Sequence, residues 1–288
     1  MAQKKQENYI KKENRRGKFL QKRDASAAER RKTIGKNLSF GSSEAYKLLR
    51  TNLMFSMADE GSCKIIGVTS ALRGEGKSTT AANLAYSLAQ SGKQTLLLEA
   101  DMRIPIQASV FRLEETPGLS HVLTGMSSLT EAVRQQTPIR TMSILPAGEI
   151  PPNPSELLSS KQMKAVLDAL AKVFEYIIID LPPINAVSDG LAVSKLLSGM
   201  IVVVREDYCD RYSLAETMQR LELLEVKLLG FVFNGAEPAK KRYRKYGYKY
   251  SQDSKYGYRY GSHDSAKGTG AAAPSQNAEG TQGRNDNV

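Results

Sequence analysis

Residues 64–90 read KIIGVTSALRGEGKSTTAANLAYSLAQ, and this stretch decides the fold of the chain. It begins with a short apolar run, continues through a loop that contains glycines and ends in a helical pattern. Gly74 and Gly76 let the loop curl so that its N–H groups point inward at phosphate oxygens, and the N-terminus of the helix adds partial positive charge. Lys77 can then reach the β- and γ-phosphates, and the Ser78 hydroxyl can bind Mg²⁺. We therefore predict a P-loop that binds ATP and Mg²⁺ through Gly74, Glu75, Gly76, Lys77, Ser78 and Thr79.

One residue of this loop departs from the usual P-loop pattern. Ala71 stands where the pattern has its first glycine. A glycine-rich turn that binds nothing is therefore the alternative interpretation.

Short apolar runs alternate with helical patterns along the middle of the chain. The apolar runs are 64–69, 94–99, 142–146, 176–180, 200–204 and 229–233, and the helical patterns are 78–90, 129–134, 155–172 and 212–224. Strands that are apolar on both faces and alternate with helices are typical of a parallel sheet covered on both sides. We predict an α/β fold: a P-loop, doubly wound, mostly parallel sheet with helices on both faces.

Two helix starts have more detailed signals. A helical pattern begins at Ser42 and places Ala45, Leu48, Leu49 and Leu53 on one face. The segment NPSE predicts a second start, with Asn153 as cap, Pro154 in the first turn and Glu156 closing a capping box.

Charge divides the chain, whose formal net charge is +11, into three parts. Residues 1–36 hold 13 Lys or Arg against four acids, and residues 240–260 hold eight against one, whereas residues 37–239 carry a net charge of −4. We predict a basic, disordered arm over residues 1–36, a P-loop domain over 37–239 and a disordered tail over 240–288. The basic ends suit an anionic partner, or they are solvated flanks.

Composition excludes several classes of protein. No run approaches the roughly 18 apolar residues that span a bilayer, and no signal peptide follows the basic start, so we expect a cytoplasmic location. Cys63 and Cys209 lie far apart in the sequence, which fits a reducing compartment and argues against a structural metal site. The two histidines leave little material for histidine chemistry.

Acidic residues end two of the apolar runs. In LLLEADMR, Glu99 and Asp101 are two residues apart, so they point the same way on an extended chain. Asp180 ends the run YIIID. Ligands of open α/β sheets bind at the carboxyl ends of the strands, where carboxylates can hold Mg²⁺ and take a proton from a hydroxyl. We predict catalytic roles for Lys77, Glu99, Asp101 and Asp180, with Mg²⁺ held by Ser78, Asp101 and Asp180; solvated acids at strand ends are the alternative.

Asn234 follows the last apolar run. We predict that it reads the edge of an adenine, with a plain turn residue as the alternative.

Seven of the thirteen tyrosines fall close together in the basic tail, namely Tyr243, Tyr246, Tyr248, Tyr250, Tyr256, Tyr258 and Tyr260. They are interleaved with Lys, Arg and Gly and have no apolar neighbours to bury them. Such a strip can stack on single-stranded nucleic acid. Beside a P-loop domain we instead predict that these tyrosines accept phosphate, and we expect no nucleic-acid partner.

Together these features closely resemble the bacterial tyrosine kinases that control capsule and exopolysaccharide synthesis. The resemblance runs from about Ser42 to Tyr260. It rests on the GEGKS loop, the carboxylate-x-Asp-x-Arg strand end, the IIID strand with Pro-Pro after it, the run 146–158 and the tyrosine cluster.

The resemblance implies a fold like that of the partition and division-site ATPases, and a reaction in which a tyrosine oxygen attacks the γ-phosphate in line. Those ATPases carry an extra lysine where this chain has Leu72, which favours the kinases. In the kinase family the first carboxylate of the strand end is a candidate base; here that residue is Glu99, where aspartate is usual. A non-kinase ATPase switch that controls membrane or partner binding is the alternative function.

The resemblance also implies partners. Family members form rings through a Glu-x-x-Arg-x-x-Arg helix, so that the tail of one subunit enters the site of the next. Because each phosphate would offset the positive charge of the tail, we expect phosphorylation to dissolve such a ring. Glu44, Lys47 and Arg50 occupy these positions, and a plain i,i+3 surface pair is the alternative. A transmembrane chain-length regulator would recruit the chain to the inner face of the membrane and complete the nucleotide site, and a tyrosine phosphatase would reverse the reaction.

Overall fold

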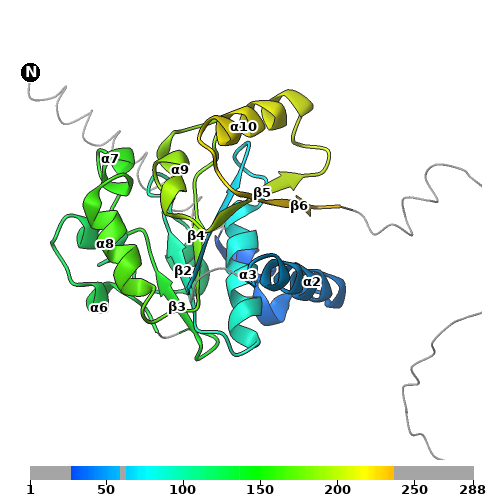
Figure 1. Ribbon diagram of the computed structural model, residues 1–288. Helices are drawn as coiled ribbons and strands as arrows, with labels where there is room; N and C mark the ends of the chain where they lie inside the picture. The colour runs from blue at the N-terminus through cyan, green and yellow to red at the C-terminus, as the bar shows by residue number, and fades with distance from the viewer. Residues whose placement is uncertain (1–26, 59–62, 136, 237–288) are drawn as a thin grey trace, which may run out of the picture. The chain divides into compact units, whose positions relative to one another are not determined.

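The computed structural model describes residues 27–58, 63–135 and 137–236. Within them, six parallel strands form one sheet in the order β3-β2-β4-β1-β5-β6 (Figure 1). The strands are β1 (Lys64–Ser70), β2 (Thr95–Glu99), β3 (Met142–Leu145), β4 (Tyr176–Asp180), β5 (Gly199–Arg205) and β6 (Leu228–Asn234). Each predicted apolar run is a strand, so the predicted α/β fold with a parallel sheet is confirmed.

Helices connect the strands. They are η1 (Gly35–Asn37), α2 (Phe40–Ser56), α3 (Lys77–Gln90), α4 (Gln107–Phe111), α5 (Leu119–Leu123), α6 (Leu129–Ala132), α7 (Pro154–Leu158), α8 (Lys161–Leu170), α9 (Asp189–Ala192), η2 (Ser194–Leu196) and α10 (Arg211–Leu223). Side-chain oxygens cap several N-termini: Ser39 accepts from the N–H of Ser42 in α2, and Asp210 accepts from two N–H groups of α10.

The sheet is buried on both faces. Successive residues of β2 and β4 alternate between two apolar clusters: Leu96 belongs to one and Leu97 to the other, as do Ile177 and Ile178. Helices α2 and α3 pack in one cluster, and α8 and α10 pack in the other (Figure 1). This double burial explains why the strands are apolar throughout rather than alternating with polar residues.

The predicted helix 155–172 is wrong in its continuity. It divides into α7 and α8 because Ser160 adopts an extended backbone and its hydroxyl caps the N–H of Met163. The predicted capping box is also wrong: Asn153 lies at the N-cap, but its amide donates to the Glu156 carboxylate instead of capping a backbone N–H.

The predicted apolar face of the helix that begins near Ser42 is only partly right. Leu53 is buried, whereas Leu48 is 62% exposed and Ala45 is also exposed. The side that packs on α3 instead carries Tyr46 and Arg50, whose polar atoms bond to that helix. The prediction failed because it considered only apolar spacing, whereas polar side chains make the contact between α2 and α3.

The packed structure begins before the predicted domain boundary at residue 37. Residues 27–31 are helical, and Ile34 and Gly35 are buried. Asn83 of α3 accepts the N–H of Gly35 at 2.9 Å and donates to the carbonyl of Thr33 at 2.9 Å. The prediction of a disordered arm is therefore wrong for residues 27–36, while residues 1–26 lie outside the described ranges.

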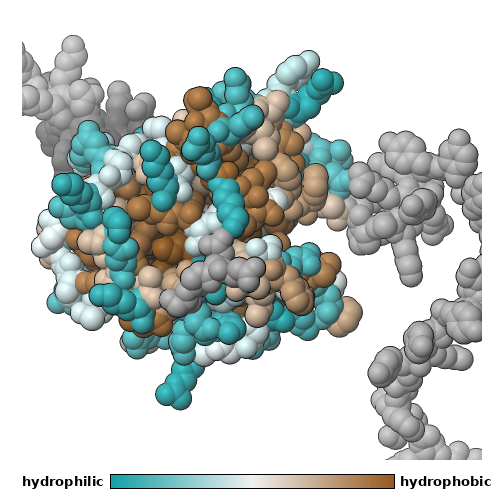
Figure 2. All heavy atoms as spheres, viewed as in Figure 1, coloured by the Kyte–Doolittle hydropathy of each residue, from teal (hydrophilic) through white to brown (hydrophobic). Residues whose placement is uncertain are grey.

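The surface in Figure 2 carries hydrophobic patches among charged side chains. Exposed apolar side chains on β6 and α10 include Phe233 and Leu223, which are 68% and 81% exposed. Strand β6 is an edge of the described sheet, which accounts for its partial burial. Among the described residues, no helix is long and apolar enough to cross a membrane.

Candidate functional site

The order of the strands brings three chain segments to one edge of the sheet. Strand β4 lies between β1 and β2, with Asp180 opposite Val68 on one side and Glu99 on the other. The P-loop follows β1, Asp101 follows β2, and Asp180 is the last residue of β4. Segments that lie far apart in the sequence therefore meet beside the N-terminus of α3.

The P-loop has the backbone that its glycines predict. Gly74 and Gly76 have φ angles of 93° and 97°, in the region that glycine adopts at little cost. A Cβ at Gly76 would lie 2.1 Å from Nδ2 of Asn234, so a larger residue would displace Asn234 as well as strain the backbone. Helix α3 starts directly after it, and Thr79 lies half-buried in its first turn.

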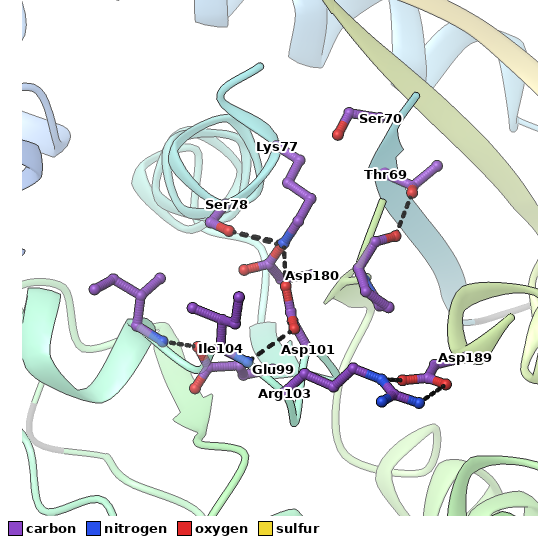
Figure 3. Close-up of polar contacts among 12 residues, drawn as sticks. Thr69, Ser70, Lys77, Ser78, Glu99, Asp101, Arg103, Ile104, Asp180 and Asp189 are labelled. Atoms are coloured by element: carbon purple, nitrogen blue, oxygen red, sulfur yellow. Dashed lines mark hydrogen bonds and ion pairs between the residues drawn. The ribbon is translucent and has the colours of Figure 1, made fainter. Parts of the chain in front are cut away.

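Lys77 lies between the two aspartates at the strand ends (Figure 3). Its Nζ is 2.9 Å from Oδ2 of Asp101 and 3.1 Å from Oδ1 of Asp180, and it donates to Oγ of Ser78 at 3.1 Å. Burial by itself lowers the pKa of Lys77, but the charges of Asp180 and Asp101 outweigh it and raise the pKa above its ordinary value. The lysine is therefore a fixed positive charge at the end of the P-loop.

The oxygen atoms around Lys77 fit Mg²⁺ bound together with a phosphate. Ser78 Oγ donates to Asp180 Oδ1 at 3.1 Å, so a hydroxyl and two carboxylates face one point. Within the described ranges, no group of three or more His, Cys, Asp or Glu side chains could hold a metal ion. Mg²⁺ commonly binds through one or two carboxylates and completes its shell with phosphates and water. The predicted set of Ser78, Asp101 and Asp180 is thus brought together by the fold.

Glu99 is part of the same strand end but does not share this role. Its carboxylate accepts the N–H groups of Ile106, Gln107 (2.7 Å) and Ala147 (3.2 Å), and the residue is only 1% exposed. Burial, and after it the charge of Asp180, raise the pKa of Glu99 to about 7 against the effect of these bonds. Both oxygens of Glu99 are enclosed and accept backbone N–H groups, and its role as the acceptor of a proton from a hydroxyl stays a prediction.

Gln107 is a site residue that the sequence interpretation missed. Its Nε2 donates to Asp180 Oδ2 at 2.8 Å and to the carbonyl of Ser78 at 3.0 Å. The only signal was a long polar side chain within the apolar run IPIQASVF. The role of Gln107 is visible only in the fold, which places α4 beside the P-loop.

Three further residues hold the P-loop from the ends of β5 and β6. Asn234 donates to the carbonyl of Glu75 at 2.8 Å, Tyr208 donates to the carbonyl of Arg73 at 2.9 Å, and Arg205 donates to the carbonyl of Gly74 at 3.3 Å. Arg205 and Tyr208 were missed because nothing in their sequence marks contacts with a loop 131 and 135 positions earlier. The adenine contact of Asn234 stays a prediction beside this observed structural role.

Glu75 is turned into the protein rather than toward a ligand. It is fully buried, and its carboxylate accepts the N–H groups of Leu72 at 2.6 Å and Arg205 at 3.3 Å. Burial, and after it Glu75, raise the pKa of Cys209 to about 12, so this thiol remains protonated. The side chain of Glu75 therefore shapes the loop, and only its backbone is positioned to contact a phosphate.

A salt bridge links the strand end of β2 to α9. Arg103 Nε and Nη2 bond to Asp189 at 2.6 Å and 3.0 Å (Figure 3). Ser155 of α7 donates to the same carboxylate. Burial alone raises the pKa of Asp189, but Arg103 and Ser155 outweigh it and lower that pKa. The arginine of the strand end thus ties α7 and α9 to the site.

The predicted oligomerisation residues have partners within the chain. Glu44 and Lys47 form an i,i+3 ion pair of 2.7 Å between half-exposed side chains. Arg50 donates to the carbonyl of Ser87 on α3 at 2.8 Å. These contacts match the surface pair that was the alternative interpretation, so a ring contact remains a proposal. The predicted acceptor tyrosines, 243–260, lie outside the described residues.

Comparison with known proteins identifies the family. A family model described as an AAA domain matches residues 63–226. The chain is 40% identical over 222 residues to "Tyrosine-protein kinase YwqD" of Bacillus subtilis (strain 168), covering 77% of this chain and 87% of that protein.

Solved structures agree. The chimerical protein CapA2B2 shares 34% identity at a TM-score of 0.67, covering 73% of this chain and 91% of that one. The septum site-determining protein MinD of Pyrococcus horikoshii OT3, complexed with Mg-ADP, shares the fold at a TM-score of 0.51 and 22% identity, covering 59% of this chain and 70% of that one. The chain has the P-loop fold of nucleotide-binding proteins and belongs to the bacterial protein-tyrosine kinases.

Proposed function

We propose that this kinase transfers the γ-phosphate of ATP to the tyrosine cluster 243–260 in the tail of a neighbouring subunit, and thereby regulates the synthesis and chain length of a capsular or extracellular polysaccharide. The observation that carries the proposal is the position of Lys77 between Asp101 and Asp180 at the end of the P-loop. The seven clustered tyrosines supply the acceptors.

The chain contributes charge and orientation to the transfer. Mg²⁺ bound with ATP would neutralise charge on the phosphates, held by Ser78, Asp101 and Asp180. Lys77 exchanges its carboxylate partners for phosphate oxygens and stabilises the charge that develops in the transition state. The N–H groups of the P-loop orient the phosphates, with the loop held in shape by Glu75 and Asn234.

We take Glu99, the first carboxylate at the end of β2, as the candidate acceptor for the proton of the attacking tyrosine, as the family resemblance implies. Asp101 Oδ2 pairs with Lys77, whereas its Oδ1 accepts the N–H of Ile104 at 3.2 Å. When Lys77 turns to phosphate, Oδ2 is released and can then help to hold Mg²⁺. Glu99 also holds the start of α4 by accepting the N–H groups of Ile106 and Gln107.

Partners follow from the family and from the site. We propose that a transmembrane chain-length regulator recruits the chain to the inner face of the membrane and completes the nucleotide site through its cytoplasmic tail. Glu44, Lys47 and Arg50 on α2 would contact the next subunit of a ring, and a tyrosine phosphatase would restore the unmodified tail. Each phosphate adds about −1.5 to −2 charge, so several would reverse the +7 of residues 240–260 and separate the ring.

The decisive experiment is mass spectrometry of the tail after incubation with Mg-ATP and the cytoplasmic tail of the membrane partner. Phosphate on residues 243–260 that is absent in Lys77→Met is the expected result. Unmodified tyrosines with continued ATP hydrolysis would reject the autokinase and support an ATPase switch instead.

A further inference from the structure

We propose that Gln107 is a positioning residue that orients Asp180 and thereby sets how strongly Mg²⁺ enhances nucleotide binding. This inference rests on the proposed use of Mg-ATP by the same site. Gln107 is the first residue of α4 and is only 1% exposed. Its buried amide donates hydrogen bonds to Asp180 and to the carbonyl of Ser78, beside Lys77.

The two oxygens of the Asp180 carboxylate have different partners, and Gln107 contacts only one of them. Oδ2 accepts from Gln107 Nε2 at 2.8 Å, whereas Oδ1 faces Lys77 Nζ and Ser78 Oγ, each at 3.1 Å. The same Nε2 donates to the carbonyl of Ser78 at 3.0 Å. One amide therefore links the strand-end acid to the first turn of α3 and prevents the carboxylate from rotating. Partners of this kind, which orient a ligand without touching the metal, tune metal sites.

A neutral donor is the suitable chemistry at this position. A lysine or arginine would neutralise Asp180 and weaken its attraction for a cation. A carboxylate would leave two acidic side chains facing each other without a donor between them. An amide fixes the orientation of Asp180 while leaving its charge available to Lys77 and to a metal ion.

The rest of α4 is anchored so that the amide is held in place. Glu99 accepts the N–H groups of Ile106 and Gln107 at the start of the helix. Arg31 donates to the carbonyl of Ser109 at 2.6 Å from the N-terminal segment. Glu99 thus supports Gln107, which gives this buried carboxylate a role in the site that does not require it to accept a proton.

The test is binding of a fluorescent ADP analogue to the full chain with and without Mg²⁺. Gln107→Met keeps the length of the side chain and removes the donor, and Gln107→Glu replaces the donor with an acid. We expect Mg²⁺-free affinity within about 2-fold of the unmodified protein. The enhancement by Mg²⁺ should fall about 10-fold in the Met variant and further in the Glu variant, because a hydrogen bond to a charged group is lost. Gln162→Met, on the exposed surface of α8, is the matched control.

Two results would overturn the proposal. One is an unchanged Mg²⁺ enhancement in both variants. The other is a parallel loss of affinity with and without Mg²⁺ together with a lower melting temperature, which would assign Gln107 a purely structural role. The assay does not depend on phosphate transfer, so an absence of tail phosphorylation would reject the proposed function and leave this test readable.

Discussion

The P-loop and the acidic strand ends lie at the same edge of the sheet, but different kinds of contact hold them. Asn234, Tyr208 and Arg205 hold the loop by donating to its backbone carbonyls. The acids are held by side-chain partners that are buried with them, above all Lys77 and Gln107. These donors to the loop are partly exposed, whereas the partners of the acids are buried and include the charged Lys77. Substitutions among the acids and their partners should therefore reduce activity and stability more than substitutions around the loop.

The largest effect is expected for Lys77→Met. Phosphoryl transfer to the tail should fall by about 1000-fold or more, because the main fixed positive charge of the site is lost. The variant should also be less stable at neutral pH, since Asp101 and Asp180 then share a buried site without a cation. Transfer rates and denaturant unfolding measure the two effects. The comparison fails if Lys77→Met lowers phosphoryl transfer and stability no more than Asn234→Ala does.

Glu99→Gln tests the acidic side through the pH dependence of the free energy of unfolding. Because the folded-state pKa of Glu99 is raised from 4.5 to about 7, the folded protein holds a proton that the unfolded chain releases. The contribution of Glu99 to stability is then fully present below pH 4.5 and is lost as pH rises toward 7, by on the order of 3 kcal/mol. The free energy of unfolding of the unmodified protein, relative to Glu99→Gln, should therefore decrease between these values. Parallel stability curves for the two proteins would contradict this assignment.

Asn234→Ala tests the loop side at the contact beside Gly76. The substitution removes the donor to Glu75 and the atoms that lie against Gly76. We expect nucleotide affinity to fall by about 10-fold, with unfolding little changed, because the loop loses one of its supports. Equilibrium binding of a nucleotide measures this. A loss as large as that of Lys77→Met would show that shape matters as much as charge.

Tyr208→Phe should have the smallest effect. Tyr208 is half-exposed, and water can replace its bond to Arg73, so nucleotide affinity should fall by about 3-fold. Tyr212→Phe is the matched control, since Tyr212 is 76% exposed and lies on the first turn of α10. Equal affinities for the two variants would mean that the tyrosine hydroxyl does not support the loop.

Much of the fold and part of the site were predictable from sequence, because they depend on local patterns; the rest depends on tertiary contacts. Apolar runs and glycines act locally, so the strands, the loop at Gly74 and Gly76, and the start of α3 followed from short stretches. The division of helix 155–172 and the early start of the packed structure were missed, because a serine cap and the contacts of Asn83 outweighed composition. The enclosure of Glu99 was also missed, because its spacing from Asp101 says nothing about the helix that covers it.

The sequence by itself determined a P-loop, a parallel sheet and a set of acids at strand ends, since these depend on residue type and on neighbours a few positions away. Only the tertiary structure decided which acid faces Lys77, which is enclosed, and that Gln107 joins them. Those roles come from the strand order, which places the end of β4 between the ends of β1 and β2. Distances across that edge depend on packing between segments about a hundred residues apart, as with Lys77 and Asp180, and no local pattern encodes them.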